Sequence, residues 1–309
     1  MKKTLLILLT VIGLCPGVFS QPFPILDNYL INPVSISPAF TGKSNIFQAF
    51  LTYRNEWVNI PGGPVIGALN IDGALNKNMG LGGNIQINKS GPLTNFIINL
   101  NYAYHLQIAK AHFLSFAINV SAYQNSINLN NVIVGSSLDP MLLGGGNKSE
   151  TYMNLGTSLL YSWKDLNVCI GFPVLFNNKS FYNQNLYEHV LTMDRNWIFY
   201  AGYTVDLKSD WKLKFDLLYR NTQYTPWTME FSTMVKFHDS YWLGAFYRKS
   251  NVIGITAGLA IVNALVINYN YEFSGSAMLG HSAGTHEISL GYMLKRKTVS
   301  LQIKDYNSK

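Results

Sequence analysis

Side chains that could carry out acid–base or nucleophilic chemistry are sparse in this sequence, and their spacing matches no common catalytic motif. The 309 residues contain no H-E-x-x-H, C-x-x-C, G-x-S-x-G or Walker A pattern, and no G-x-G-x-x-G that begins a helix. Ser282, His286 and Glu287 are close enough in the chain to suggest a Ser/His/acid set. His286 and Glu287 are, however, neighbours in an expected strand, so their side chains should point to opposite faces. We therefore expect no catalytic residue and no enzyme activity.

Metal, cofactor and nucleic-acid sites are equally poorly supported. The histidines show no paired ligand spacing; they are His105, His112, His189, His238, His281 and His286. Two glycine clusters, Gly80–Gly83 and Gly144–Gly146, fit a bend in a strand and a loop rather than a phosphate site. Basic residues are dispersed rather than clustered with aromatic residues, so only the net charge of +7 would favour nucleic acid. We expect no metal, no cofactor and no nucleic-acid partner.

The start of the chain predicts export. Residues 1–20 have the basic start, apolar run and small-residue end of a secretory signal peptide, with cleavage expected after Ser20. Cys15 could suggest a lipoprotein, but Leu14 stands where a lipidation site takes a small residue. Cleavage would leave Cys169 as the only cysteine of the 2 in the sequence, so the fold must form without an internal disulfide.

Composition then restricts the class of exported protein. Aromatic residues make up 14% of the chain and charged residues 13%, whereas soluble domains have about 25% charged residues. After the signal peptide no apolar run approaches the roughly 20 residues of a membrane helix. Only helices and closed barrels satisfy every backbone polar group in lipid, so this composition favours a β-barrel of a Gram-negative outer membrane. A soluble β-sandwich, whose strands also alternate, is the alternative.

Hydrophobic periodicity predicts an all-β, antiparallel transmembrane barrel of about 14 strands over residues 45–295, followed by a tail at 296–309. The longest connections, 125–149 and 176–193, follow the fifth and seventh strands, whereas connections after even-numbered strands are short. Outer-membrane barrels have long extracellular loops and short periplasmic turns, so this alternation of connection lengths predicts that both chain ends are periplasmic. The expected strands are 45–58, 64–75, 79–88, 93–107, 111–124, 150–163, 165–173, 195–207, 211–220, 227–237, 241–248, 252–261, 264–273 and 285–295.

Charged and tryptophan residues take defined positions in such a barrel. A cation at the lipid midplane costs about 2–4 kcal/mol, so charged strand residues should face the lumen. These are Lys212, Lys214, Asp216, Arg220, Glu230 and Glu272. Tryptophan prefers the membrane interface, and all six tryptophans fall near strand ends. The expected aromatic girdle is Trp57, Trp163, Trp197, Trp211, Trp227 and Trp242.

Residues 21–44 interrupt the regular pattern before the first strand. Pro33 and Pro38 each remove a backbone donor and restrict the preceding residue, so this stretch cannot be a ladder strand. Its apolar side chains, Phe40 among them, are of the type found buried. We expect an ordered, irregular segment that packs in or under the periplasmic mouth of the barrel.

Several short stretches recur in a characteristic order. The N-terminal part has Asn32-Pro33, then Ser37 to Gly42, then Tyr53 to Trp57, and the C-terminal part has His286-Glu287 and Gly291-Tyr292. In this order they resemble the PorP/SprF family of type IX secretion system outer-membrane proteins from Bacteroidetes. The family opening normally carries Asn at position 37 and Tyr at position 40, where this chain has Ser37 and Phe40. The residues at the positions of the family motif are Asn32, Pro33, Pro38, Ala39, Phe40, Gly42, Tyr53, Arg54, Trp57, His286, Glu287, Gly291 and Tyr292.

This resemblance implies a non-enzymatic barrel that works in type IX secretion or gliding motility. Its partners would be an adhesin-like secreted protein with a C-terminal sorting domain and periplasmic or outer-membrane components of the machinery. Such a barrel could retain or export its partner through the long loops outside and the chain ends inside. The alternative is a porin or small-molecule transporter, because lumen charges of both signs fit an open pore as well as a filled interior.

Overall fold

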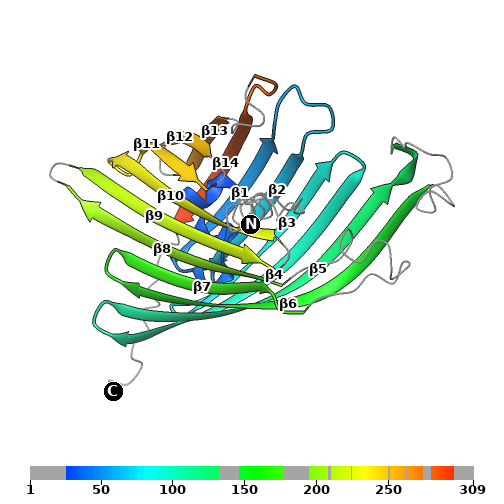
Figure 1. Ribbon diagram of the computed structural model, residues 1–309. Coiled ribbons are helices and arrows are strands. Elements are labelled where there is room, and N and C mark those ends of the chain that lie inside the picture. Colours follow the sequence, from blue (N-terminus) through cyan, green and yellow to red (C-terminus); the bar gives the residue numbers. More distant parts are fainter. Residues whose placement is uncertain are drawn as a thin grey trace, which may run out of the picture.

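The computed structural model describes residues 26–131, 146–176, 195–207, 210–223, 225–249, 251–261, 264–273 and 280–295. Their strands form one closed antiparallel barrel in which each strand pairs with its sequence neighbours and β1 pairs with β14 (Figure 1). The strands are β1 (Ile46–Asn55), β2 (Val65–Ala74), β3 (Met79–Ser90), β4 (Leu93–Ala109), β5 (His112–Asn128), β6 (Asn147–Trp163), β7 (Leu166–Val174), β8 (Asn196–Asp206), β9 (Trp211–Thr222), β10 (Thr225–Phe237), β11 (Tyr241–Arg248), β12 (Val252–Ile261), β13 (Leu265–Phe273) and β14 (Thr285–Lys295).

The predicted barrel of about 14 strands is confirmed, with one shortened loop. Residues 125–128 and 147–149 were expected in the long connection after the fifth strand. Instead they continue the β5–β6 ladder, in which Asn125 pairs with Glu150 and Asn128 with Asn147. Cross-strand hydrogen bonding therefore extends into a stretch whose polar composition predicted a loop. The expected signal peptide, residues 21–25, the tail at 296–309, Gly144, Gly145 and His189 lie outside the described residues.

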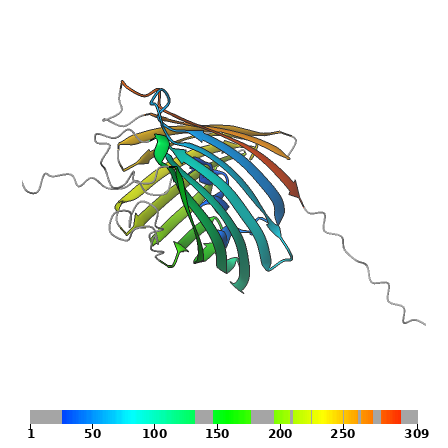
Figure 2. The ribbon, with the colours of Figure 1, turned by 90° about the vertical axis from the view of Figure 1, so that its right-hand side faces the viewer.

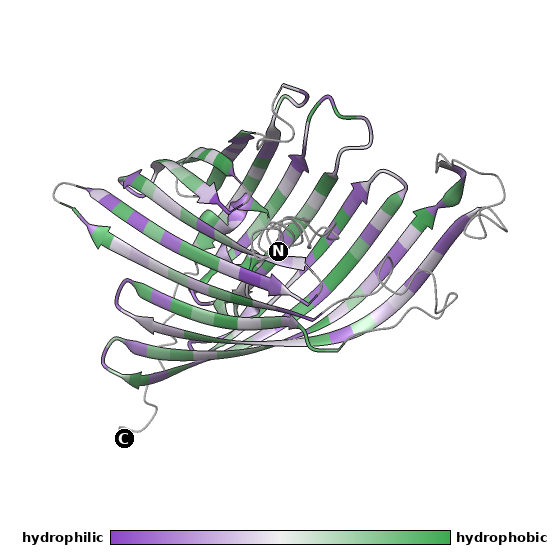
Figure 3. Ribbon diagram, in the orientation of Figure 1, coloured by the Kyte–Doolittle hydropathy of each residue, from purple (hydrophilic) through white to green (hydrophobic). Residues whose placement is uncertain are grey.

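Alternation along the strands separates two faces of the wall (Figure 3). On β1 the outward residues Phe47, Leu51 and Tyr53 are exposed, whereas Thr52 and Arg54, which alternate with them, are buried inside. Leu100 on β4 and Leu243 on β11 are likewise exposed on the outer face. No helix in the described ranges is long and apolar enough to cross a membrane.

The barrel has two ends that differ in their connections. Because the strands are antiparallel and even in number, β1 begins and β14 ends at the same end, which we call the terminus end. Turns there are short, as between β2 and β3 and between β6 and β7. The opposite end, which we call the loop end, joins β5 to β6 and β7 to β8, where the sequence has its longest connections.

Residues 26–45, which we call the lumen segment, run inside the barrel (Figures 1 and 2). The segment consists of three short 3-10 helices, η1 (Asp27–Leu30), η2 (Pro33–Ser35) and η3 (Pro38–Phe40). Pro33 and Pro38 start η2 and η3, where the fixed φ and missing N–H of proline are tolerated. The Ser37 hydroxyl accepts the Ala39 N–H at 3.3 Å and caps η3.

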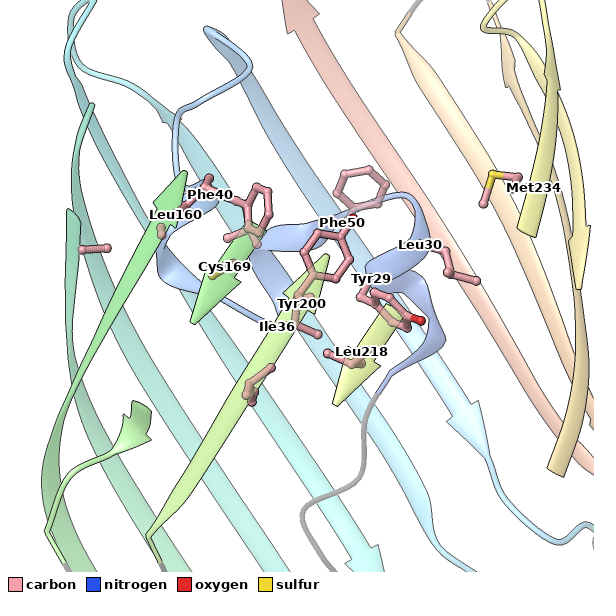
Figure 4. Close-up of a cluster of buried hydrophobic side chains, with 14 of the residues drawn as sticks. Tyr29, Leu30, Ile36, Phe40, Phe50, Leu160, Cys169, Tyr200, Leu218 and Met234 are labelled. Carbon is pink, nitrogen blue, oxygen red and sulfur yellow. The ribbon is translucent and has the colours of Figure 1, made fainter. Parts of the chain in front are cut away.

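Apolar side chains of the lumen segment form the main core of the molecule with inward-facing wall residues (Figure 4). Tyr29 and Phe40 pack edge-to-face against Tyr200 of β8, with ring centroids 6.5 and 5.6 Å apart. The wall contributes apolar residues at positions that a water-filled lumen would make polar, among them Phe50 and Leu160, which are fully buried. The barrel interior is therefore packed around the lumen segment in the way that a soluble domain packs its core.

Candidate functional site in the barrel lumen

Near the loop end, the lumen segment meets a cluster of buried charges that we call the loop-end charge cluster. Asp27 of the lumen segment accepts from two guanidinium groups: Oδ2 lies 2.7 Å from Arg54 Nη1, and Oδ1 lies 2.6 Å from Arg248 Nη2. Glu272 also contacts both arginines, at 2.8 and 2.7 Å. The described members are Asp27, Arg54, Glu56, Glu230, Arg248, Glu272 and Glu287.

Hydrogen bonds extend this cluster over five strands. The Asp27 N–H donates to Glu287 Oε2 at 2.9 Å, and Asn270 Nδ2 donates to the other oxygen of Glu287 at 2.9 Å. The Tyr29 hydroxyl donates to Glu230 Oε1 at 2.5 Å. Together these contacts join η1 to β1, β10, β11, β13 and β14. Charge-assisted bonds of this kind are strong in a buried setting, so the start of the lumen segment is firmly held.

A second set of polar contacts holds the middle of the segment. Lys214 Nζ donates to the Leu30 carbonyl at 2.9 Å and pairs with Asp216 Oδ2 at 3.1 Å. Asp216 also accepts the Tyr200 hydroxyl at 2.5 Å. The ammonium group of Lys214 is thereby turned inward, and the helix carbonyl that it meets is satisfied.

At the terminus end, the segment is anchored by backbone groups and one lysine. The Gly42 N–H donates to Asp72 Oδ2 at 2.9 Å, and His105 Nε2 donates to the Thr41 carbonyl at 2.9 Å. Lys43 Nζ donates to Ser162 Oγ at 2.6 Å and to Asn167. These contacts hold the end of the lumen segment to side chains of β2, β4, β6 and β7.

Gly80 allows the segment to approach the wall closely. A Cβ atom at Gly80 would lie 2.0 Å from the Thr41 carbonyl oxygen, which is backbone and cannot rotate away. The glycine cluster at 80–83 thus has a packing role, because its first residue lies directly under the lumen segment.

A cavity of about 140 Å³, lined by both polar and apolar side chains, remains between the segment and the wall. Val34 and Ile36 form part of one side, and wall amides line the other. Asn70, Asn119 and Asn196 are buried, and each keeps one polar atom without a protein partner. The space is large enough for several water molecules or one small neutral solute.

The structure places all six sequence-predicted lumen charges on the inner face. Glu230 and Glu272 belong to the loop-end charge cluster, together with Arg54 and Glu287 of the family motif. Lys214 and Asp216 contact the middle of the segment, Arg220 lines the cavity, and Lys212 lies at the terminus end, where it pairs with Asp239 at 2.7 Å. Sequence reasoning did not single out Asp27, Glu56 or Arg248, which complete the cluster.

The remaining family-motif residues divide between the lumen and the outer face. Asn32 and Ala39 are buried in the lumen segment with Phe40, and Gly291 leaves room for the Phe50 ring, which a Cβ would approach to 2.4 Å. Tyr53, His286 and Tyr292 face outward, and His286 Nδ1 lies 2.6 Å from the Tyr269 hydroxyl. His286 and Glu287 therefore point to opposite faces, and Ser282 Oγ contacts Gly284 instead.

Five of the six expected girdle tryptophans lie at the two ends of the barrel. Trp57, Trp197 and Trp227 are at the loop end, and Trp163 and Trp211 are at the terminus end. The expectation that Trp242 belongs to the girdle is wrong. Its side chain is 8% exposed and donates from Nε1 to Asn268 Oδ1 at 2.7 Å inside the barrel. Outward residues of β11 are Tyr241, Leu243 and Tyr247, so Trp242 has inward parity although it is near a strand end.

No group of three or more His, Cys, Asp or Glu side chains suited to a metal ion occurs among the residues that the structure describes. Cys169 is a buried free thiol that donates to Ser37 Oγ at 3.1 Å. The arrangement is that of a tethered, packed segment, and its chemistry is recognition between two parts of one chain.

Comparison with known proteins identifies one family and one fold. The family described as type IX secretion system membrane protein PorP/SprF matches residues 18–292. The CymD monoaromatic hydrocarbon channel is similar in structure, with a TM-score of 0.52 and 11% identity over 88% of this chain and 93% of that chain. A Pseudomonas aeruginosa FadL homologue gives a TM-score of 0.49 and 10% identity over 88% and 95%. No protein with a curated description matches the sequence.

Proposed function

The chain belongs to the PorP/SprF family of type IX secretion system membrane proteins, and from this premise we propose that its barrel works by binding a secreted protein. The barrel would lie in the outer membrane of a Gram-negative bacterium, with the terminus end in the periplasm and the loop end outside. Short turns at the terminus end support this orientation, because outer-membrane barrels have short periplasmic turns.

The observation that carries the proposal is the occupied lumen. A general pore needs a continuous water-filled path, but here the lumen segment is tethered at three levels and packed against the wall. Such an interior favours a rigid, non-enzymatic scaffold whose ends contact other proteins. The partner class is an adhesin-like secreted protein with a C-terminal sorting domain, exported or retained together with other components of the secretion machinery.

The alternative function is transport of small solutes. The amide-lined cavity beside the lumen segment favours it, because neutral polar solutes bind to such groups. The CymD channel has the same fold, but at 11% identity the likeness concerns fold alone.

An in-frame deletion of the gene tests the proposal through the set of surface proteins. We expect one large protein with a C-terminal sorting domain to disappear from the cell surface, and the wild-type gene to restore it. A surface proteome identical to that of the parent strain would contradict the proposal. Loss of uptake of a small solute with an unchanged surface proteome would support the transporter instead.

A further inference from the structure

The lumen segment begins near the loop end of the barrel. Leu26 packs with Ile66 and Ala68, which lie at the loop end of β2. Asp27 binds Arg54, the second-last residue of β1, and Arg248, the last residue of β11. β1 and β11 both run toward the loop end, so the two arginines fix the level of Asp27 in the barrel.

The segment finishes at the terminus end. The Gly42 N–H binds Asp72, and the backbone at 41–42 lies against Gly80, the second residue of β3. Lys43 binds Ser162, the second-last residue of β6, and β1 starts at Ile46. Residues 26–45 therefore cross the height of the barrel from the loop end to the terminus end.

We infer that the mature amino terminus lies outside the cell, on the side opposite to the end of β14. The inference rests on the orientation given under the proposed function. It differs from the expectation of a periplasmic amino terminus, because Leu26, the first described residue, lies at the loop end.

Chain length prevents the amino terminus from returning through the lumen. If the signal peptide ends at Ser20, residues 21–25 reach at most about 18 Å from Leu26. The ten residues of β1 measure about 33 Å along the strand, and at a tilt near 40° they span roughly 25 Å of barrel height. The core beside the segment is also filled by Tyr29, Phe40, Phe50 and Tyr200, which leaves no room for a second strand of chain.

Epitope accessibility in the full-length protein tests this topology. One variant carries a short epitope between Gln21 and Pro22. Two matched controls carry the same epitope between Pro61 and Gly62 at the loop end, and between Lys77 and Asn78 at the terminus end. Antibody binding is measured on intact cells and after permeabilisation of the outer membrane. Heat-dependent gel mobility confirms that each barrel is folded. If the insertion after Gln21 does not fold, P22C in a C169S background takes its place, and a membrane-impermeant maleimide is the probe.

We expect the Gln21 insertion to give the same intact-cell signal as the loop-end control, with no increase after permeabilisation. The terminus-end control should react only after permeabilisation. Reaction of the Gln21 insertion only after permeabilisation, with the loop-end control positive on intact cells, would overturn the inference and leave the proposed function standing. Intact-cell reaction of the terminus-end control alone would show an inverted barrel, and would overturn both the inference and the proposed orientation.

Discussion

Asp27 brings a carboxylate into the interior of the barrel, and its two oxygens bind two different guanidinium groups. An isolated charge in such a place would be very costly, so the residue is retained only with its partners. The carboxylate of Asp27 and the two wall arginines thus each need the other in order to be buried. Arg54 and Glu287 are drawn together here by closure of β1 against β14.

Replacement of Asp27 by Asn should weaken this contact strongly. Asparagine offers one acceptor oxygen, and its amide would face a guanidinium donor, so the change should lower the free energy of unfolding by roughly 3 kcal/mol. Urea unfolding of the detergent-solubilised barrel measures the difference. The same change at Asp239, whose ion pair with Lys212 is exposed, should cost less than about 0.5 kcal/mol. Equal effects at both positions would contradict the assigned role of Asp27.

Gly80 permits a different kind of contact, between backbone and backbone. In G80A the new methyl group would meet the Thr41 carbonyl at 2.0 Å, and relieving this overlap should cost about 1–3 kcal/mol. A Cβ atom at Gly67 would meet nothing within 4 Å, so G67A is the matched control and should be close to neutral. Heat-dependent gel mobility compares the two variants. A G80A barrel as stable as G67A would show that the segment does not lie against β3.

Strands of this barrel were readable from sequence because their signal is local. Most outward positions are apolar and most inward positions are polar, so a period of two identifies the strand without knowledge of its neighbours. The place of a residue near a strand end is a weaker guide than this period of two. Trp242 shows the difference: it lies near a strand end, but its position in β11 is inward, and its ring lies beside Gly258, where a Cβ would approach it to 2.5 Å.

The position of the lumen segment could not be read in the same way, because it depends on contacts far apart in the chain. A signal was nevertheless present: Phe50, Leu160, Leu218 and Met234 occupy inward positions and are apolar, and all four are buried. In a water-filled lumen these apolar side chains would contact water, which would lower the stability of the barrel. Apolar residues at inward positions of several strands therefore indicate that something occupies the barrel.

The outer face of β4 gives a prediction for the wall itself. Leu100 is 64% exposed near the middle of the strand, and Ile108 is 53% exposed near its end, at the register shift between Gln107 and Ala109. L100R should destabilise the barrel in lipid vesicles by about 2–4 kcal/mol and I108R by about 0–1 kcal/mol, because the cost depends on membrane depth. Urea unfolding in vesicles provides the comparison. Equal costs would mean that β4 does not cross the lipid with Leu100 near the midplane.

At the scale of the whole molecule, the structure combines a lipid-facing wall with a packed interior. Because the barrel is closed, every strand has a hydrogen-bonded neighbour on both sides. Inside, Asp27 of the lumen segment pairs with the buried wall residues Arg54 and Arg248. A barrel of this width without such a segment would hold a wide polar passage. The packed interior therefore supports the proposed role, in which the barrel holds a partner at its ends, over passage of solutes through its centre.

Conductance in planar lipid bilayers tests this claim most directly. A variant without residues 26–41, shown to be folded by heat-dependent gel mobility, serves as the open control and should give a large, steady conductance through its amide-lined interior. The wild-type protein, inserted in equal amount, should remain electrically silent. A large and steady conductance from the wild-type protein would contradict the account.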